Sequence, residues 1–247
     1  MKNRFQIDIN ADVGEGIDNE SDLMPLLSSC NIACGGHVGD LKSMTAVARL
    51  AKHYDVKIGA HPSFPDPINF GREVMELSDS DLFLSLKQQI NALLTILNYE
   101  NVELHHIKPH GALYNLAAKD EKTAQVIVAV IKEFSMSIKL YAPWRSVIAT
   151  MARREQIEVI YEAFADRNYN HDLSLVSRKN ENAILHKKEA VLNHVLGMIK
   201  DQKVTSVNGK KVPIKASTIC VHGDTDSAVE IVRYLSEHLK KNNIEIK

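Results

Sequence analysis

The stretch His106–Asn115, HIKPHGALYN, places a lysine and a histidine on either side of a proline, where a strand is predicted to end. The apolar run before it predicts a strand over 102–109, and the apolar spacing after Gly111 is typical of a helix. A loop that only had to turn the chain would not need Lys108 and His110. We therefore interpret both as side chains that a strand delivers to a functional site.

The same unit of a strand, a polar turn and a helix recurs along the chain. Strands are predicted over 4–10, 28–34, 56–61, 102–109, 137–143, 157–164 and 217–223. Helices are predicted over 41–54, 78–100, 120–134, 144–155, 187–202 and 226–242. This alternation predicts an α/β fold with parallel strands and helical crossovers, arranged as a barrel or as a doubly wound open sheet.

Composition bounds the class of protein. The 247 residues carry a formal net charge of -1, and 45% of them are hydrophobic. The near-neutral charge without a basic block argues against nucleic acid as a partner. No apolar run approaches the ~20 residues of a membrane span, and the first ten residues lack the apolar core of a signal peptide. We expect a cytoplasmic protein with no membrane association, in which Cys30, Cys34 and Cys220 are reduced.

Six of the seven predicted strands are followed by polar and ionisable side chains. In chain order these are Asn10, Asp12 and Glu15; His37 and Asp40; His61, Asp66 and Arg72; Lys108, His110 and Tyr114; Asp166, Arg167 and Tyr169; and His222 and Asp224. In a parallel barrel all carboxyl ends open on one rim, where active sites are built. The set therefore favours an irregular seven-stranded parallel (β/α) barrel. We predict a single barrel domain over 1–247, and Asn208-Gly209 predicts a small β-hairpin insertion near 204–214.

A metal is the main alternative within this site. Asp12, His37, His61 and His222 make a carboxylate-plus-imidazole set of the kind that zinc uses. The chain has no His-x-x-x-His pair, however, and a general base can activate water by itself. We expect no metal; if a divalent metal is present, these four residues are its predicted ligands.

Six segments then carry a resemblance to a known family. They are DINADVGEG (8–16), NIACGGHVGD (31–40), IGAHPSFPD (58–66) with NFGR (69–72), HIKPHGALYN (106–115), FADRNY (164–169) and TICVHGDT (218–225). With these segments in this order, the chain resembles the LamB/YcsF family of 5-oxoprolinase A subunits over nearly its whole length. Departures from the family pattern are Ala11 in place of cysteine, Gly36 in place of an aromatic residue, Ser63-Phe64 in place of Gly-Tyr, and Ser177 in place of proline.

The resemblance implies a glycoside hydrolase/deacetylase-like barrel and a hydrolase activity on a cyclic amide. The substrate would be 5-oxo-L-proline, whose lactam ring is opened to L-glutamate with hydrolysis of ATP, and the partners would be subunits B and C of 5-oxoprolinase. ATP would be a co-substrate of the complex, while this chain lacks the Gly-x-x-x-x-Gly-Lys-[Ser/Thr] loop that cradles phosphates. We therefore assign the nucleotide chemistry to the partner subunits.

Lactam opening needs an activated water, a stabilised oxyanion and a proton for the leaving nitrogen. The predicted catalytic residues are Asp12, Glu15, His61, Lys108, His110 and Asp166. Asp12 or Glu15 would be the base. The predicted substrate-binding residues are Asn10, His37, Arg72, Tyr114, Arg167, His222 and Asp224. Two other functions fit the same rim: a metal-dependent deacetylase or amidohydrolase that acts without ATP, and a non-catalytic regulatory subunit that binds a ligand.

Overall fold

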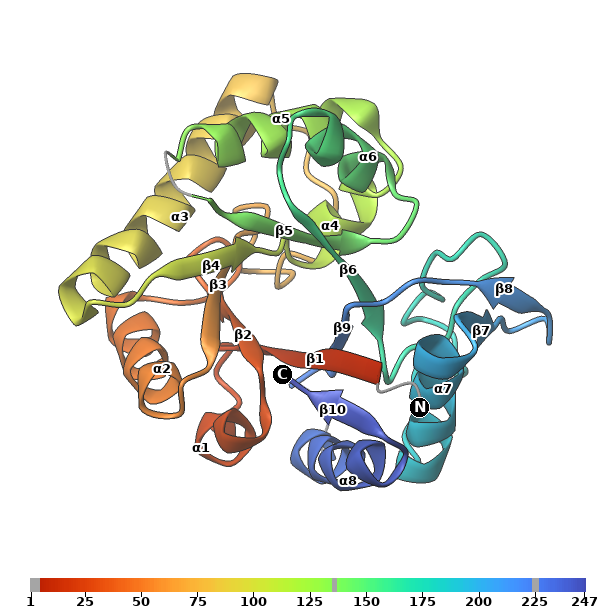
Figure 1. Ribbon diagram of the computed structural model, residues 1–247. Coiled ribbons are helices and arrows are strands. Elements are labelled where there is room, and N and C mark those ends of the chain that lie inside the picture. The colour runs from red at the N-terminus through yellow and green to blue at the C-terminus, as the bar shows by residue number, and fades with distance from the viewer. Residues whose placement is uncertain (1–4, 135–136, 224–226) are drawn as a thin grey trace.

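The computed structural model of the chain describes residues 5–134, 137–223 and 227–247. Its main sheet is parallel and closed, because strands pair in order around a ring and the last pairs back with the first (Figure 1). The strands of this ring are β1 (Phe5–Val13), β2 (Ser29–Ala33), β3 (Lys57–His61), β4 (Leu104–Ile107), β5 (Lys139–Pro143), β6 (Val159–Phe164) and β9 (Thr218–Cys220). The predicted seven-stranded parallel barrel is confirmed.

The helices lie outside this ring of strands (Figure 1). The longer ones are α2 (Leu41–His53), α3 (Asp79–Glu100), α5 (Glu121–Lys132), α6 (Val147–Arg154), α7 (Lys188–Lys200) and α8 (Ala228–Lys241). The shorter ones are α1 (Glu20–Leu23), the 3-10 turn η1 (Met24–Leu26) and α4 (Gly111–Ala117). Ser78 caps α3 by accepting a hydrogen bond from the Asp81 backbone N–H.

Three strands of the described part of the chain lie outside the ring. β10 (Ile244–Ile246) follows α8 and pairs in parallel with the first residues of β1, where Phe5 lies opposite Ile244. β7 (Lys203–Thr205) and β8 (Lys211–Pro213) form an antiparallel pair, and Gly209 in their connection has φ +74°. A positive φ is available to glycine at little cost, which is why Asn-Gly suits such a turn.

The outward face of β1 is apolar and belongs to the hydrophobic core. Along β1 this face consists of Ile7, Ile9, Ala11 and Val13, all at most 2% exposed. Burying an isoleucine side chain contributes ~1.5–3 kcal/mol relative to leaving it exposed. This alternation therefore fixes which face of β1 turns away from the helices, because side chains in a strand alternate between its two faces.

The inward face of the barrel is polar and hydrogen bonded in rows. At the amino ends, Asp8 Oδ1 accepts hydrogen bonds from Ser29 Oγ at 2.7 Å and Thr218 Oγ1 at 2.5 Å. In the next row, Asn31 Nδ2 donates to Asn10 Oδ1 at 2.8 Å, and His106 Nε2 donates to Asn31 Oδ1 at 2.6 Å. Buried polar groups are stable only when they are paired in this way.

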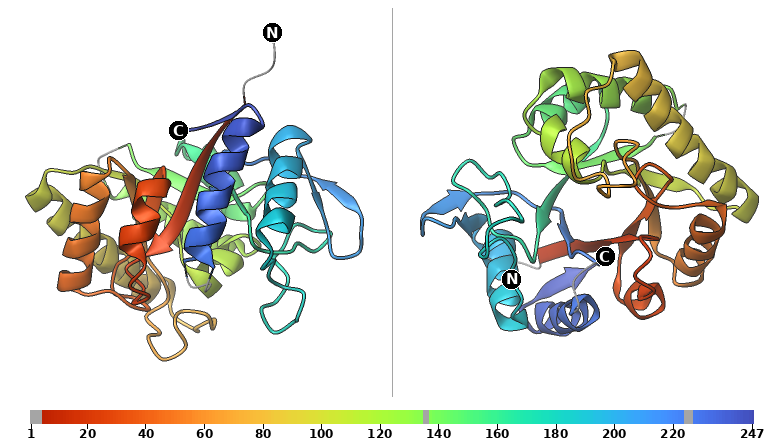
Figure 2. Two further views of the ribbon diagram at one scale, coloured as in Figure 1. Left: turned by 90° about the horizontal axis from the view of Figure 1, so that it is seen from below. Right: turned by 180° about the vertical axis from the view of Figure 1, so that it is seen from behind.

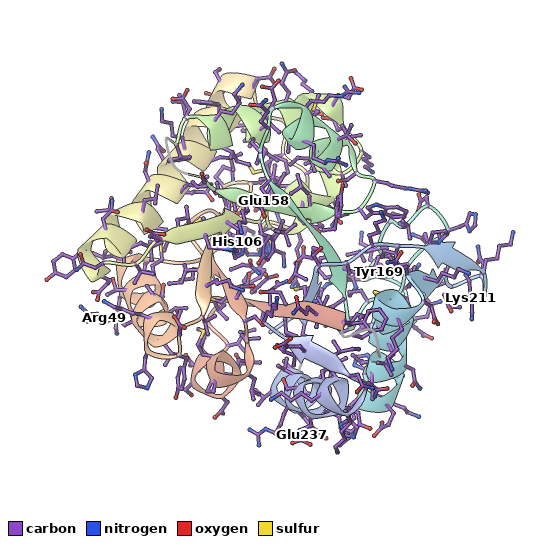
Figure 3. The ribbon with its side chains drawn as sticks, viewed as in Figure 1. Arg49, His106, Glu158, Tyr169, Lys211 and Glu237 are labelled. Carbon is purple, nitrogen blue, oxygen red and sulfur yellow. The ribbon has the colours of Figure 1, made fainter. Side chains whose placement is uncertain are left out.

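His106 also explains one glycine of the barrel. Figure 3 shows His106 among the strands, whereas Arg49 and Glu237 lie at the periphery. A Cβ atom at residue 59 would lie 2.1 Å from Nε2 of His106, so only glycine fits at this point of β3. Among the described residues, no helix combines the length and apolar character that a membrane crossing requires.

Candidate active site

The carboxyl ends of the barrel strands bring most of the predicted residues to one end of the barrel. Asp12 lies in β1 and His61 ends β3. The others lie in the segments that follow their strands, namely Glu15, His37, Lys108, His110, Asp166, Arg167 and His222. Figure 2 shows the loops after β3 and β6 projecting on one side of the molecule, away from the C-terminus. Asp224 lies outside the described residues.

Three histidines and a glutamate form a compact cluster. The rings of His37 and His110 are stacked, with centroids 3.7 Å apart and an interplanar angle of 3°. His110 Nδ1 lies 2.9 Å from His61 Nε2. Glu15 Oε1 lies 2.9 Å from His37 Nε2 and 3.4 Å from His110 Nδ1. Burial lowers the pKa of both His37 and His110 below that of an ordinary histidine, which favours neutral rings.

A buried ion network lies beside this cluster. Lys108 Nζ contacts Asp12 Oδ1 at 2.8 Å and Glu162 Oε1 at 2.9 Å. Burial alone would lower the pKa of Lys108, but the negative charge of Asp12 and its other neighbours raises it well above the usual value. Burial alone would likewise raise the pKa of Asp12, but positive charge on the groups around it, including the Lys108 ammonium, holds it well below the usual value. Lys108 is therefore an ammonium and Asp12 a carboxylate at neutral pH.

Asn10 belongs to the same network. Its Nδ2 donates to Glu162 Oε1 at 3.1 Å, and its Oδ1 lies 3.4 Å from Lys108 Nζ. Asn10 is fully buried inside the barrel. The side chain that sequence analysis assigned to substrate binding thus lies in the layer below Asp12 and contacts other side chains of the network.

Asp166 and His222 form a second pair. Asp166 is fully buried, and its Oδ1 accepts a hydrogen bond from His222 Nδ1 at 2.9 Å. The backbone N–H of His222 also donates to Asp166 Oδ2, at 3.2 Å. These contacts direct the proton of a neutral His222 to Nδ1 and make Nε2 the basic nitrogen, as in many catalytic acid–base pairs.

Members of the histidine cluster, the ion network and the Asp166–His222 pair border one cavity of about 530 Å³. Asp12, His61 and His222 line it together with Tyr114. Among the described residues, five cationic side chains also border it, namely Arg72, Lys108, Arg167, Arg178 and Lys179, against the two carboxylates Asp12 and Glu73. Such a wall favours an anionic ligand, since a low-dielectric cleft lined by one sign of charge concentrates ions of the opposite sign.

Arg167 also donates hydrogen bonds to backbone carbonyls. Its Nη2 donates to the Val176 carbonyl at 2.6 Å and its Nε donates to the Ala183 carbonyl at 3.3 Å. Arg167 therefore braces the segment that follows β6 while it borders the cavity.

Three residues that shape the site were not predicted from the sequence. Glu162 lies within a strand rather than after one, Asn31 lies in the middle of β2, and Ser63 follows His61. Asn31 Nδ2 donates to Asp12 Oδ1 at 2.8 Å, and Ser63 Oγ lies 3.1 Å from His37 Nδ1. A polar residue at an inward position of a predicted strand is the signal that would have found Glu162 and Asn31.

Two groups of described residues bring their ligand atoms close enough to hold a metal ion. They are Asp12, His61 and His110, and Glu15, His37 and His110; within each group the atoms lie within 4.8 Å of one another. His222, which the sequence-based metal set included, is in neither group and instead binds Asp166.

The two neighbouring departures from the family pattern, Gly36 and Ser63, contact each other. A Cβ atom at residue 36 would lie 2.3 Å from Ser63 Oγ and 2.4 Å from Gln89 Oε1. Gln89 on α3 holds this loop in place, because its Oε1 accepts from the Ser63 backbone N–H at 2.9 Å. A side chain at position 36 would therefore collide with both Ser63 and Gln89, and a smaller residue at position 63 would relieve only the first of these contacts.

We predict that Gly36→Ala lowers the free energy of unfolding by about 1–3 kcal/mol, the usual cost of overpacking. Adding Ser63→Gly should restore part of this loss, because it removes the Oγ atom that the new Cβ meets. Urea unfolding of the wild type, both single variants and the double variant measures this coupling. Strictly additive effects would show that the two positions do not compensate each other.

Comparisons with known proteins give a consistent result. The family model described as LamB/YcsF family matches residues 7–247. The A subunit of 5-oxoprolinase from Haemophilus influenzae (strain PittEE) is 43% identical over 241 residues, which cover 98% of each chain. The crystal structure of a lactam utilization protein from Thermus thermophilus is 35% identical, with a TM-score of 0.91 over 98% of this chain and 99% of that one. A family 4 carbohydrate esterase from Streptomyces lividans, 7% identical with a TM-score of 0.50, covers 98% of this chain and 91% of its own and shares the fold alone.

Proposed function

This chain belongs to the LamB/YcsF family, and from that premise we propose that it is the lactam-opening subunit of an ATP-dependent 5-oxoprolinase. Its reaction converts 5-oxo-L-proline to L-glutamate by cleavage of the ring C–N bond. The names of its relatives, which are the A subunit of 5-oxoprolinase and a lactam utilization protein, support this assignment.

The observation that carries the proposal is the chemistry of the cavity. It combines a carboxylate–imidazole group at Asp12 and His61 with a second acid–base pair at His222 and Asp166, inside a wall rich in cations. The substrate has one carboxylate, and negative charge builds up on its amide oxygen as water adds to the carbonyl carbon. A cationic wall stabilises both charges, and the imidazoles move the protons.

We assign proton transfer to His222. Its Nε2 takes a proton from the attacking water, whose hydroxyl group adds to the carbonyl carbon of the ring. The same proton then passes to the ring nitrogen as the C–N bond breaks. Asp12 is a poor candidate for this base, because its pKa is held well below the usual value and a good general base has a pKa near the working pH.

Lys108 acts on Asp12 rather than on the substrate. Its ammonium is engaged by Asp12 and Glu162, so its role is to hold the Asp12 carboxylate in place at the floor of the cavity. Arg72 and Arg178 border the same cavity and are the candidates for binding the substrate carboxylate or a phosphate.

The proposal is tested by glutamate release. We expect a mixture of this chain with subunits B and C to form glutamate from 5-oxo-L-proline and ATP, and the same mixture without this chain to form none. The uncharged lactam 2-pyrrolidinone should be a much poorer substrate, because it lacks the carboxylate that the cationic wall binds. ATP consumption should be followed in parallel in every mixture.

Two outcomes would replace the proposal by another function. Hydrolysis of an amide or an acetylated sugar by this chain alone, without ATP, would identify a stand-alone amidohydrolase or deacetylase. Binding of 5-oxo-L-proline with no glutamate formed in the complete mixture would identify a regulatory subunit.

A further inference from the structure

The outward nitrogen of each clustered imidazole faces a hydrogen-bond acceptor. His61 Nδ1 lies 2.7 Å from the carbonyl oxygen of Lys108, and His110 Nε2 lies 2.9 Å from the carbonyl oxygen of Phe70. A carbonyl oxygen can only accept, so both nitrogens carry their hydrogen. The tautomers of these two rings are therefore fixed by the backbone.

The tautomer of His37 is fixed as well, in this case by the hydroxyl group of Ser63. Its Nδ1 lies 3.1 Å from Ser63 Oγ, and the hydroxyl hydrogen of Ser63 is donated to the carbonyl oxygen of Phe64 at 2.7 Å. Ser63 Oγ therefore accepts from His37 Nδ1. In each of the three neutral rings, the nitrogen that carries the hydrogen therefore faces away from the centre of the cluster.

The inward atoms of the neutral cluster are consequently all acceptors. His61 Nε2 and His110 Nδ1 lie 2.9 Å apart, with a lone pair on each. Asp12 Oδ2 lies 3.4 Å from His61 Nε2, and Glu15 Oε1 lies 3.4 Å from His110 Nδ1. Lone pairs at such distances repel one another unless a positive charge lies between them.

The charges lead to the same requirement. Asp12, Glu15 and Glu162 bring three carboxyl groups to the cluster and its adjoining network, against one ammonium from Lys108. Among the described residues, these carboxyl groups therefore outnumber the ammonium groups that contact them. Their side chains are at most 9% exposed, and buried charges are stable when they are paired or bind a metal.

We propose that Asp12, His61 and His110 bind one divalent transition-metal ion, with Glu15 as an additional carboxylate at the same position. Imidazole and carboxylate donors suit zinc, cobalt and manganese. The outward bonds to backbone carbonyls and Ser63 are the outer contacts that metal-binding imidazoles usually make. Asp12 and His61 remain from the sequence-based ligand set. His110 takes the place of His222, which Asp166 already holds, and His37 is not among the proposed ligands.

The metal site deepens the proposed function, since Asp12 and His61 also border the substrate cavity. Its test, however, needs neither substrate nor partner subunits. The chain is treated with a chelator, dialysed and titrated with Co²⁺, with visible absorption bands as the readout, and with Zn²⁺ by calorimetry. We expect one ion per chain and a higher melting temperature with metal, because a ligand that binds only the folded chain stabilises it.

Variants separate ligands from neighbours. His110→Gln and Asp12→Asn should each weaken Co²⁺ binding by at least about 100-fold, since loss of even an outer partner costs about 10–100-fold. His222→Gln should bind Co²⁺ like the wild type while losing glutamate formation. The exposed His171→Gln serves as the control for adventitious surface binding.

Absence of Co²⁺ and Zn²⁺ binding by the folded wild type would overturn the site, as would unchanged binding in His110→Gln. If the rings instead share protons, ¹⁵N spectra of the metal-free chain at neutral pH will show imidazolium at His61 or His110 that persists when metal is added, which also overturns it. Metal binding without glutamate release would sustain this inference while the proposed function fails.

Discussion

Replacing His222 with glutamine is expected to lower kcat for glutamate formation by ~10²–10⁴-fold, the usual contribution of a positioned acid–base group. His222 borders the cavity, and buried Asp166 fixes its Nδ1 side through a 2.9 Å hydrogen bond. Glutamine cannot take up a proton at neutral pH, so the step from water to the ring nitrogen loses its carrier. The measurement is glutamate release in the mixture with subunits B and C, alongside the melting temperature of the variant.

Asp166→Asn tests the hydrogen-bonded pair of Asp166 and His222 by changing the carboxylate instead of the imidazole. Asparagine keeps the size of the side chain but loses the charge that directs the proton of His222 to Nδ1. We expect a loss of kcat of the same order, and a double variant no worse than the more severe single one, because residues that act as a unit are strongly non-additive. His171→Gln, at an exposed position after β6, should match the wild type. Wild-type kcat in Asp166→Asn would remove Asp166 from the mechanism.

The closed barrel was predictable from the sequence because its signals are local and repeated. The first strand alternates apolar and polar residues, and the helices show a 3.6-residue apolar pattern. The convergence of distant residues then followed from the rule that parallel strands open on one rim.

Other parts of the molecule carry no such local signal. β10 is only three residues long, so no periodicity marks it, and it becomes a strand by pairing with β1. Lys108 lies close to other residues that were predicted from the sequence, but its ammonium also contacts Glu162 on β6, a partner 54 positions away along the chain. The choice of His110 over His222 as a neighbour of His61 depends on side-chain directions, which sequence spacing does not contain.

Lys108→Met is expected to have the largest effect on stability, a loss of about 3–5 kcal/mol in the free energy of unfolding. The ammonium of Lys108 is buried and contacts Asp12 Oδ1 at 2.8 Å and Glu162 Oε1 at 2.9 Å. Methionine fills similar space but leaves two buried carboxylates without their cation. Removing one partner of a buried ion pair is costly for this reason, even where the intact pair contributes little. Urea unfolding followed by circular dichroism gives the free energy.

A second change separates charge from packing in this prediction. Adding Glu162→Gln to Lys108→Met removes one of the two stranded charges, so the double variant should be more stable than Lys108→Met alone, despite carrying two substitutions. Lys87→Met is the matched control, because Lys87 pairs with Glu133 at the surface, where such a pair is worth at most about 1 kcal/mol. If Lys108→Met unfolds at the same urea concentration as Lys87→Met, the ammonium does not hold this network together. If the double variant is the least stable of the set, the loss comes from packing and not from unpaired charge.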